Sequence, residues 1–216
     1  MNNAESIKEL REKFISAINT FALELRKFIH KFTAVYRARA WLNDNYLILD
    51  TETTGLGKDA EIVEISIIDC KGRVKLNTLV KPRNPIPTEA TAIHGITNEM
   101  VASAPEWRDV YYLFRMIALD KTLVIYNADF DVRLIVQSTA ISDFARDPYK
   151  PRAVCAMRNY ANYHGQWDER RNNFKWQSLA NAAKQMNVTI EDTPHRALAD
   201  CKTTLAVIKA MAGGVK

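Results

Sequence analysis

The order of strand-type and helix-type segments limits this chain to few folds. Three segments of strand character come first, and Lys71-Gly72 between the last two is a hairpin turn signal. A short buried strand and several helical patterns then alternate. This order predicts an α/β fold, a mixed β-sheet flanked by helices. The expected strands are Tyr46–Asp50, Ile62–Asp69, Val74–Val80 and Leu123–Tyr126, and the expected helices are Asn98–Met100, Trp107–Leu119, Phe130–Ser138, Gln177–Met186 and Ala197–Met211.

Less regular segments connect these elements. Pro82, Pro85 and Pro87 predict an irregular connection after the third strand. Residues 154–157 are expected to form a buried helical segment, in which Cys155 is a small core residue instead of a nucleophile. Residues 188–190 are a candidate short strand.

Residues 5–40 differ from the rest of the chain. Neither proline nor glycine interrupts them, and apolar residues recur at steps of three or four, which is the helical period and close to a heptad. We expect one long amphipathic helix or two shorter ones. The apolar stripe could pack on the main domain, associate with a second copy, dock to a protein partner or lie on a membrane surface, although its mixed charges disfavour the last. The stripe consists of Ile7, Leu10, Phe14, Ile18, Phe21, Leu25, Phe28, Phe32 and Val35.

The composition is that of a globular protein. With 216 residues, of which 47% are apolar and 25% charged, the chain can bury the core of one domain and carry an appendage. Three distant cysteines form neither a zinc pair nor a disulfide framework, which favours a reducing compartment. Because the sequence shows neither a transmembrane run nor a secretory signal, we expect a cytoplasmic protein without membrane contact. The net charge of +5 fits a polyanionic partner without requiring one.

Acidic residues follow the predicted strands. Asp50 and Glu52 lie at the end of the first strand, and their i, i+2 spacing places both carboxylates on one side. Asp131 follows the strand at 123–126, and Asp200 lies one turn into the last predicted helix, close to His195. Carboxylates held close together repel one another unless a cation such as Mg²⁺ or Mn²⁺ neutralises them. Alternatively, the acids are solvated and His195 is a helix cap or a surface residue.

Four short motifs carry a specific resemblance. The strings are ILDTETTGL from Ile48, AIHGIT from Ala92, NADFD from Asn127 and HRALAD from His195. In order and spacing they resemble the motifs of the DEDDh (DnaQ-like) 3′→5′ exonucleases, which include bacterial proofreading subunits, RNase T and oligoribonuclease. The resemblance covers roughly residues 46–212 and implies an RNase H-like fold. We therefore expect a helical extension over residues 1–45 and an exonuclease domain over residues 46–216.

The resemblance also implies a mechanism. Two divalent cations, Mg²⁺ or Mn²⁺, would stabilise the attacking and leaving oxygens of phosphodiester hydrolysis and release nucleoside 5′-monophosphates. Asp50, Glu52 and Asp200 would hold the first cation, and Asp50 and Asp131 the second. His195 would be the general base that deprotonates the attacking water, so that activity rises with pH as the imidazole becomes neutral. The family pattern selects Asp131 over Asp129, which is expected to be solvated or helix-capping.

Further residues match positions that receive the terminal nucleotide. The backbone of Thr53 and Gly55 would meet the 3′-hydroxyl. Leu56 would wedge against the last base, or else pack in the core. Ile93, His94 and Phe130 would line the same pocket, although Phe130 could instead be a core residue and His94 could hydrogen-bond the loop backbone.

A basic and aromatic stretch spans residues 146–175. Positive side chains attract phosphates and aromatic rings stack on unpaired bases, which suits a single-stranded end. Alternatively, the aromatic residues pack on the domain and the basic residues are solvated. Its segment NNFKW, residues 172–176, departs from commoner family members. The stretch contains Arg146, Lys150, Arg152, Arg158, Arg170, Arg171 and Lys175, interleaved with Tyr149, Tyr160, Tyr163, Trp167 and Phe174.

The expected function is thus hydrolysis of a single-stranded 3′ end. The proofreading-type motif at residues 92–97 favours DNA over RNA as the substrate. A module that binds nucleic acid without turnover is the alternative from another class, although retention of all five acidic and histidine positions argues against it. A third possibility is an exonuclease recruited to a polymerase or DNA repair assembly through residues 5–40.

Overall fold

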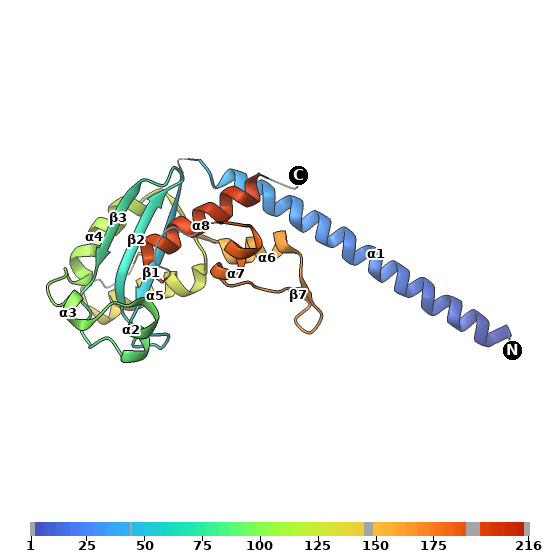
Figure 1. Ribbon diagram of the computed structural model, residues 1–216, viewed down its shortest axis with the longest axis horizontal. Coiled ribbons are helices and arrows are strands. Elements are labelled where there is room, and N and C mark those ends of the chain that lie inside the picture. The colour runs from blue at the N-terminus through green and yellow to red at the C-terminus, as the bar shows by residue number, and fades with distance from the viewer. Residues whose placement is uncertain (1–2, 44, 145–148, 189–194, 214–216) are drawn as a thin grey trace.

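The computed structural model describes residues 3–43, 45–144, 149–188 and 195–213, with side chains from residue 7 onward. Five strands form one sheet in the order β3-β2-β1-β4-β5 (Figure 1). The β1–β2 and β2–β3 pairs are antiparallel, whereas β1–β4 and β4–β5 are parallel. The predicted mixed sheet is therefore confirmed. The strands are β1 (Tyr46–Thr53), β2 (Ile62–Asp69), β3 (Val74–Leu79), β4 (Thr122–Ile125) and β5 (Ala153–Cys155), and a separate hairpin contains β6 (Trp167–Asp168) and β7 (Asn173–Phe174).

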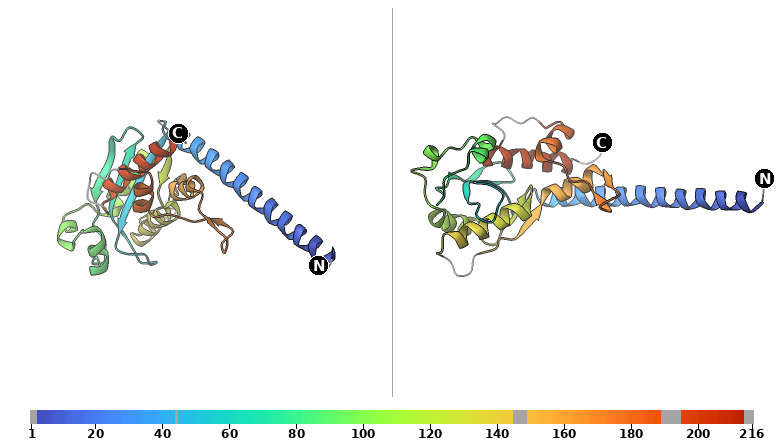
Figure 2. Two further views of the ribbon diagram at one scale, coloured as in Figure 1. Left: turned by 45° about the vertical axis from the view of Figure 1, so that its right-hand side comes forward. Right: turned by 90° about the horizontal axis from the view of Figure 1, so that it is seen from below.

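Helices cover both faces of the sheet (Figures 1 and 2). Helices α4 and α5 pack on one face, where Phe114 and Leu134 belong to one apolar cluster. Helices α6, α7, α8 and the end of α1 cover the other face, where Tyr160 and Leu205 belong to a second cluster. The helices are α1 (Asn3–Ala40), α2 (Thr88–His94), α3 (Asn98–Val101), α4 (Trp107–Ala118), α5 (Ala128–Ile141), α6 (Ala156–His164), α7 (Leu179–Gln185) and α8 (Ala197–Ala212).

Strand β1 is the centre of the sheet and sorts its side chains between the two faces. Successive side chains of a strand point to opposite sides. Leu47 and Leu49 accordingly join the cluster under α4 and α5, and Ile48 joins the cluster under α8. By the same alternation, Asp50 and Glu52 lie on the α8 side and Thr51 on the α5 side.

Two short elements differ from the sequence prediction. Residues 153–155 form strand β5, not part of a helix, and helix α6 begins at Ala156. Strand β5 has only three residues and exists because it pairs with β4, a long-range contact that no local pattern reveals. Cys155 is half-buried, and its thiol donates to the carbonyl oxygen of Tyr126 over 3.3 Å.

Helix α2 lies within the segment predicted to be irregular. Pro87 precedes its first residue, where a missing N–H costs nothing, and Gly95 ends it with a φ of 71° in the left-handed region. The motif from Ala92 to Thr97 is thus partly helical. Val188 lies outside a strand, and the rest of the candidate strand at residues 188–190 lies outside the described residues.

Residues 3–40 form one helix, α1, of 38 residues, which is about 57 Å long. Its second half packs on the domain, since Ala34 and Ala38 are fully buried and Asn159 donates to the carbonyl oxygen of Ala34. Its first half extends away from the domain (Figures 1 and 2). Phe14 and Phe21 are 67% and 71% exposed, so the apolar stripe faces solvent along most of its length, and only its last member, Val35, is buried. Within the described residues, no helix combines the length and the apolarity that a bilayer span requires.

Candidate active site

Three carboxylates from two elements meet at one end of the central strand. Asp50 and Glu52 lie on β1, and Asp200 lies in the first turn of α8. One carboxylate oxygen from each lies within 4.8 Å of the other two. Residues separated by 150 positions in the sequence are thus brought together, and their oxygen atoms could hold a hard divalent cation.

Asp131 approaches this cluster from the opposite helix layer. It lies in the first turn of α5 and is only 4% exposed. The hydroxyl of Thr51 donates a hydrogen bond of 2.7 Å to its Oδ1 atom. Asp131 is close enough to Asp50 for its charge to raise the pKa of that carboxyl. All four predicted carboxylates therefore lie around the end of β1, and Thr51 was missed by the sequence analysis.

The electrostatics of the cluster favour added positive charge. Burial raises the pKa of Asp50 well above its ordinary value, and the neighbouring carboxylates Asp131, Asp200 and Glu52 raise it further. Burial, together with Asp200, raises the pKa of Glu52 to about 8. Burial also raises the pKa of Asp131 to about 7, although the Thr51 hydroxyl opposes this. Divalent cations would neutralise these mutually repelling groups, so the residues present fit the metal sites that the sequence predicts.

A fifth acid, Glu64, was also missed. It lies on β2 directly opposite Glu52 and is 3% exposed. Its carboxylate accepts hydrogen bonds from Nε and Nη2 of Arg196 at 3.1 and 2.6 Å, and from the backbone N–H of Ala197 at 2.9 Å. Ala197 is the first residue of α8, so Glu64 caps this helix from the sheet. A glutamate within the mostly apolar run at 62–68 is the signal that could have found it.

His195 lies two residues before the first residue of α8. Its side chain is exposed and its φ is 58°, a left-handed conformation that is rare outside glycine, asparagine, aspartate and histidine. Burial raises the pKa of Asp200, while the charge and backbone N–H of His195 lower it. The imidazole is therefore close to the carboxylates and open to solvent. Residues 189–194, which precede His195, lie outside the described residues.

The predicted pocket residues gather at the end of β1. Thr53 is 8% exposed, and its hydroxyl donates to the carbonyl oxygen of Gly55 over 2.8 Å. His94 is 5% exposed; its Nε2 atom lies 3.2 Å from the carbonyl oxygen of Thr53, and its Nδ1 atom accepts from the N–H of Ile96. Burial lowers the pKa of His94, so the ring is held neutral. His94 thus hydrogen-bonds the loop backbone, which is one of the two roles that the sequence suggested for it.

Two apolar residues of this pocket face solvent. Leu56 is 81% exposed and Ile93 is 61% exposed, so neither is a core residue. Phe130 is half-buried and packs against the core cluster under α4 and α5. Arg133 places its guanidinium 5.2 Å from the centre of the Phe130 ring and donates to the carbonyl oxygens of Leu56 and Gly57. Arg133, which the sequence analysis missed, therefore fixes the loop that carries Leu56.

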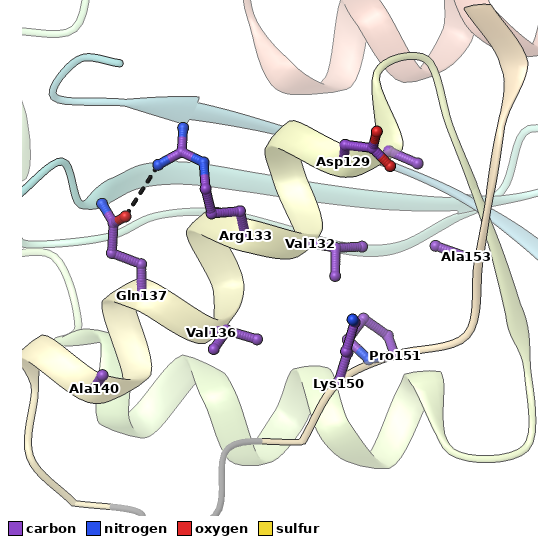
Figure 3. A pocket seen from close by; sticks show the side chains of 10 residues that line it. Asp129, Val132, Arg133, Val136, Gln137, Ala140, Lys150, Pro151 and Ala153 are labelled. Carbon is purple, nitrogen blue, oxygen red and sulfur yellow. Dashed lines mark hydrogen bonds between the residues drawn. The ribbon is translucent and has the colours of Figure 1, made fainter. Parts of the chain in front are cut away.

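A separate groove of about 510 Å³ runs along the outer side of α5 (Figure 3). Val132, Val136 and Pro151 give it an apolar wall, with Arg133 and Lys150 at its edges. Asp129 also lines this groove. Its side chain is exposed and pairs with Arg158. Asp129 is thus solvated, as expected, and Asp131 is the buried acid of the pair.

The aromatic residues of the stretch at 146–175 pack against protein. Trp167 lies beneath the guanidinium of Arg26, Phe174 contacts the His30 ring edge-on, and Tyr163 lies beneath the ammonium of Lys31. These partners are all on α1. The aromatic residues of the stretch therefore form part of the surface on which α1 packs. Its basic residues are exposed, namely Lys150, Arg152, Arg158, Arg170, Arg171 and Lys175. Arg146 lies outside the described residues.

Comparison with known proteins places this arrangement in a family. The family model described as Exonuclease (RNase_T) matches residues 47–208. Uncharacterized exonuclease CP81 of Escherichia phage 186 is 49% identical over 186 residues, which cover 84% of this chain and 95% of that protein. The DNA polymerase III subunit epsilon of Buchnera aphidicola subsp. Schizaphis graminum is 35% identical over 101 residues, which cover 42% of this chain and 43% of that protein.

Solved structures of exonucleases have the same fold as this chain. Exonuclease X in complex with 5′ overhanging duplex DNA is 30% identical, with a TM-score of 0.57, over 78% of this chain and 92% of that one. E. coli exonuclease I in complex with a dA16 oligonucleotide shares the fold, with a TM-score of 0.60 at 17% identity, over 74% of this chain and 39% of that one. The chain belongs to the RNase_T exonuclease family. It is therefore a nuclease-family protein with a nucleic-acid-binding fold.

Proposed function

We propose that this protein is a DEDDh-type 3′→5′ exonuclease that hydrolyses single-stranded DNA to nucleoside 5′-monophosphates. The observation that carries the proposal is the convergence of Asp50, Glu52 and Asp200 within 4.8 Å, with Asp131 and His195 beside them. Membership in the exonuclease family supports the same chemistry.

Two divalent cations, Mg²⁺ or Mn²⁺, fit this site. Asp50, Glu52 and Asp200 would hold one cation, and Asp50 and Asp131 the other. When bound, such a pair stabilises negative charge on the attacking and leaving oxygens. The exposed imidazole of His195 accepts the proton of the attacking water. Thr51 and Glu64 hold the ligands in position through the hydrogen bonds to Asp131 and to the start of α8.

The terminal nucleotide would enter beside the loop after β1. The exposed side chains of Leu56 and Ile93 offer apolar surfaces for the last base, with Phe130 behind them. The backbone of Thr53 and Gly55 offers groups for the 3′-hydroxyl. DNA is preferred over RNA in this proposal because exonuclease X, at 30% identity, was solved with DNA.

The proposal is tested with matched DNA and RNA strands labelled at the 5′ end. With Mg²⁺ or Mn²⁺ we expect a ladder of products shortened from the 3′ end and 5′-monophosphate release, faster on DNA, and EDTA should stop it. Binding of the strand without cleavage would identify a binding module instead. Cleavage from the 5′ end, or equal rates with EDTA, would overturn the proposal.

A further inference from the structure

The solvent-facing side of α1 presents an apolar surface without a partner among the described residues. Four phenylalanines along it are each about 70% exposed, and Ile and Leu residues fill the positions between them. Helix faces of this kind are normally covered. The exposed large apolar side chains of α1 are Ile7, Leu10, Phe14, Ile15, Ile18, Phe21, Leu25, Phe28, Ile29, Phe32 and Tyr36.

This stripe points away from the domain. The residues of α1 that are fully buried against the domain, Ala34 and Ala38, lie on the opposite side of the helix from the phenylalanines. On that inner side, the ammonium of Lys31 lies over the ring of Tyr163, and Asn159 of α6 donates to the carbonyl oxygen of Ala34. The domain therefore cannot fold back to cover the stripe without giving up these contacts.

The spacing of the stripe is that of a helix–helix seam. From Phe14 to Phe32 the exposed apolar residues follow alternating steps of four and three, which is a heptad repeat over more than two heptads. A second helix covers such a seam with knobs-into-holes packing. The charges of α1 are of mixed sign, unlike the uniformly basic polar face that is typical of a helix lying on a membrane.

The exposed area is sufficient for a stable dimer. A large aromatic side chain buries roughly 150–250 Å² when it is fully covered, so the four exposed phenylalanines alone offer on the order of 500 Å². The remaining Ile and Leu side chains bring the stripe to roughly 1,000 Å² per chain, above the roughly 800 Å² per partner of a standard interface.

We propose that the stripe is the self-association surface of this protein, and that two copies pair their α1 helices antiparallel. The charges of α1 select this orientation. Residues 24–39 carry five Lys and Arg against Glu24, whereas residues 3–23 carry three of each sign. Antiparallel pairing places each basic half against a neutral half, whereas parallel pairing places two basic halves together. It also sets the two catalytic domains at opposite ends of the paired helices.

The oligomeric state of the full chain tests the proposal. We expect light scattering coupled to gel filtration to give the mass of a dimer, which dissociates on dilution. The triple variant Phe14→Glu, Phe21→Glu, Phe28→Glu should be a monomer. The matched control Ser16→Glu, Asn19→Glu, Thr20→Glu adds the same charge to exposed positions outside the stripe and should remain a dimer. Circular dichroism and nuclease rate on a short strand should be unchanged in both.

Orientation is tested by crosslinking. In an antiparallel pair two Leu10 residues lie roughly 30 Å apart, too far for a disulfide. Leu10→Cys protein alone should therefore not crosslink, whereas a mixture with Phe28→Cys protein should form the mixed disulfide. Efficient crosslinking of Leu10→Cys alone would overturn the antiparallel arrangement. If the wild-type chain is a monomer, self-association is overturned. A monomeric chain that floats with phosphatidylserine vesicles would show that the stripe binds a membrane surface instead.

Discussion

The guanidinium of Arg196 forms two hydrogen bonds with the carboxylate of Glu64, a residue 132 positions earlier in the chain. The same carboxylate accepts the N–H of Ala197 and so holds the start of α8 on strand β2. Since Asp200 lies one turn further along α8, this pair sets the distance between the third carboxylate and the two on β1. The ion pair is thus a positioning device for the proposed metal site.

Replacing Glu64 with alanine should therefore cost both stability and activity. Removing Glu64 leaves the charge of Arg196 without its partner, and we expect the free energy of unfolding to fall by about 3 kcal/mol. This value is at the lower end of the range for broken buried ion pairs because Arg196 is partly exposed. Urea unfolding measures the loss. Arg158→Ala, which removes an exposed ion pair with Asp129, is the control and should cost less than about 1 kcal/mol. Equal losses in the two variants would contradict the positioning role.

The imidazole of His195 should be dispensable for folding but not for turnover. His195→Ala removes the proposed general base from an exposed position, so kcat should fall by about 10²–10⁴-fold. Binding of Mn²⁺, followed by calorimetry, should remain because the carboxylates are unchanged. A variant that keeps the wild-type kcat would assign the proton transfer to another group.

Asp131 and Asp129 provide a comparison within one helical turn. Asp131→Asn should reduce hydrolysis to background, since a buried carboxylate facing Asp50 is lost. Asp129→Asn, at an exposed position, should leave the rate unchanged. Steady-state rates with Mg²⁺ distinguish the two. The reverse order of effects would place the second cation elsewhere.

The raised pKa values make the stability of the metal-free protein depend on pH. Glu52 has an ordinary pKa of 4.5 and a pKa of about 8 in the fold, and Asp131 rises from 3.8 to about 7. Between these values the unfolded chain has released more protons than the folded one, so stability falls as pH rises from about 4.5 to about 8. Thermal melts in EDTA should show this fall. Added Mn²⁺ should restore more stability at pH 8 than at pH 5, and an opposite trend would contradict the assignment.

Arg133 should influence substrate binding more than chemistry. Arg133→Ala removes the hydrogen bonds to the carbonyl oxygens of Leu56 and Gly57, which fix the loop beside the proposed base-binding surface. We expect KM to rise by about 3–10-fold, with kcat within about twofold. Lys150→Ala, which lines the same groove without holding the loop, is the control. Equal effects on KM would remove the positioning role.

The sequence predicted the larger elements of the fold because their patterns are local. The alternating residues of β2 and the helical period of α8 reveal both elements without knowledge of their neighbours. Strand β5 could not be predicted this way, since three residues carry no period and their pairing with β4 is a long-range contact. Helix α2 was missed because three prolines suggested irregular chain, although Pro87 lies where a helix accepts it.

In the candidate site, the motif residues could be predicted from the sequence, whereas the residues that hold them in position could not. Asp50, Glu52, Asp131 and Asp200 lie together as expected. Glu64 stood out only as a charged residue in a mostly apolar strand, and its role was hidden because its partner Arg196 is distant in sequence. For α1 the sequence left the partner of the apolar stripe open; in the structure the stripe mostly faces solvent, because small residues such as Ala34 and Ala38 make the contact with the domain.

The capping of α8 from the sheet has a consequence for how the molecule matures. Asp50 and Glu52 are in place once β1 pairs with β2, but the third carboxylate arrives only when α8 docks on Glu64. A partly folded chain would thus contain most of the sheet and yet lack hydrolytic competence. Any state in which α8 has left the sheet would lack the third carboxylate of the proposed metal site, and it would also uncover the apolar cluster that Leu205 and Ile208 form with Ile48.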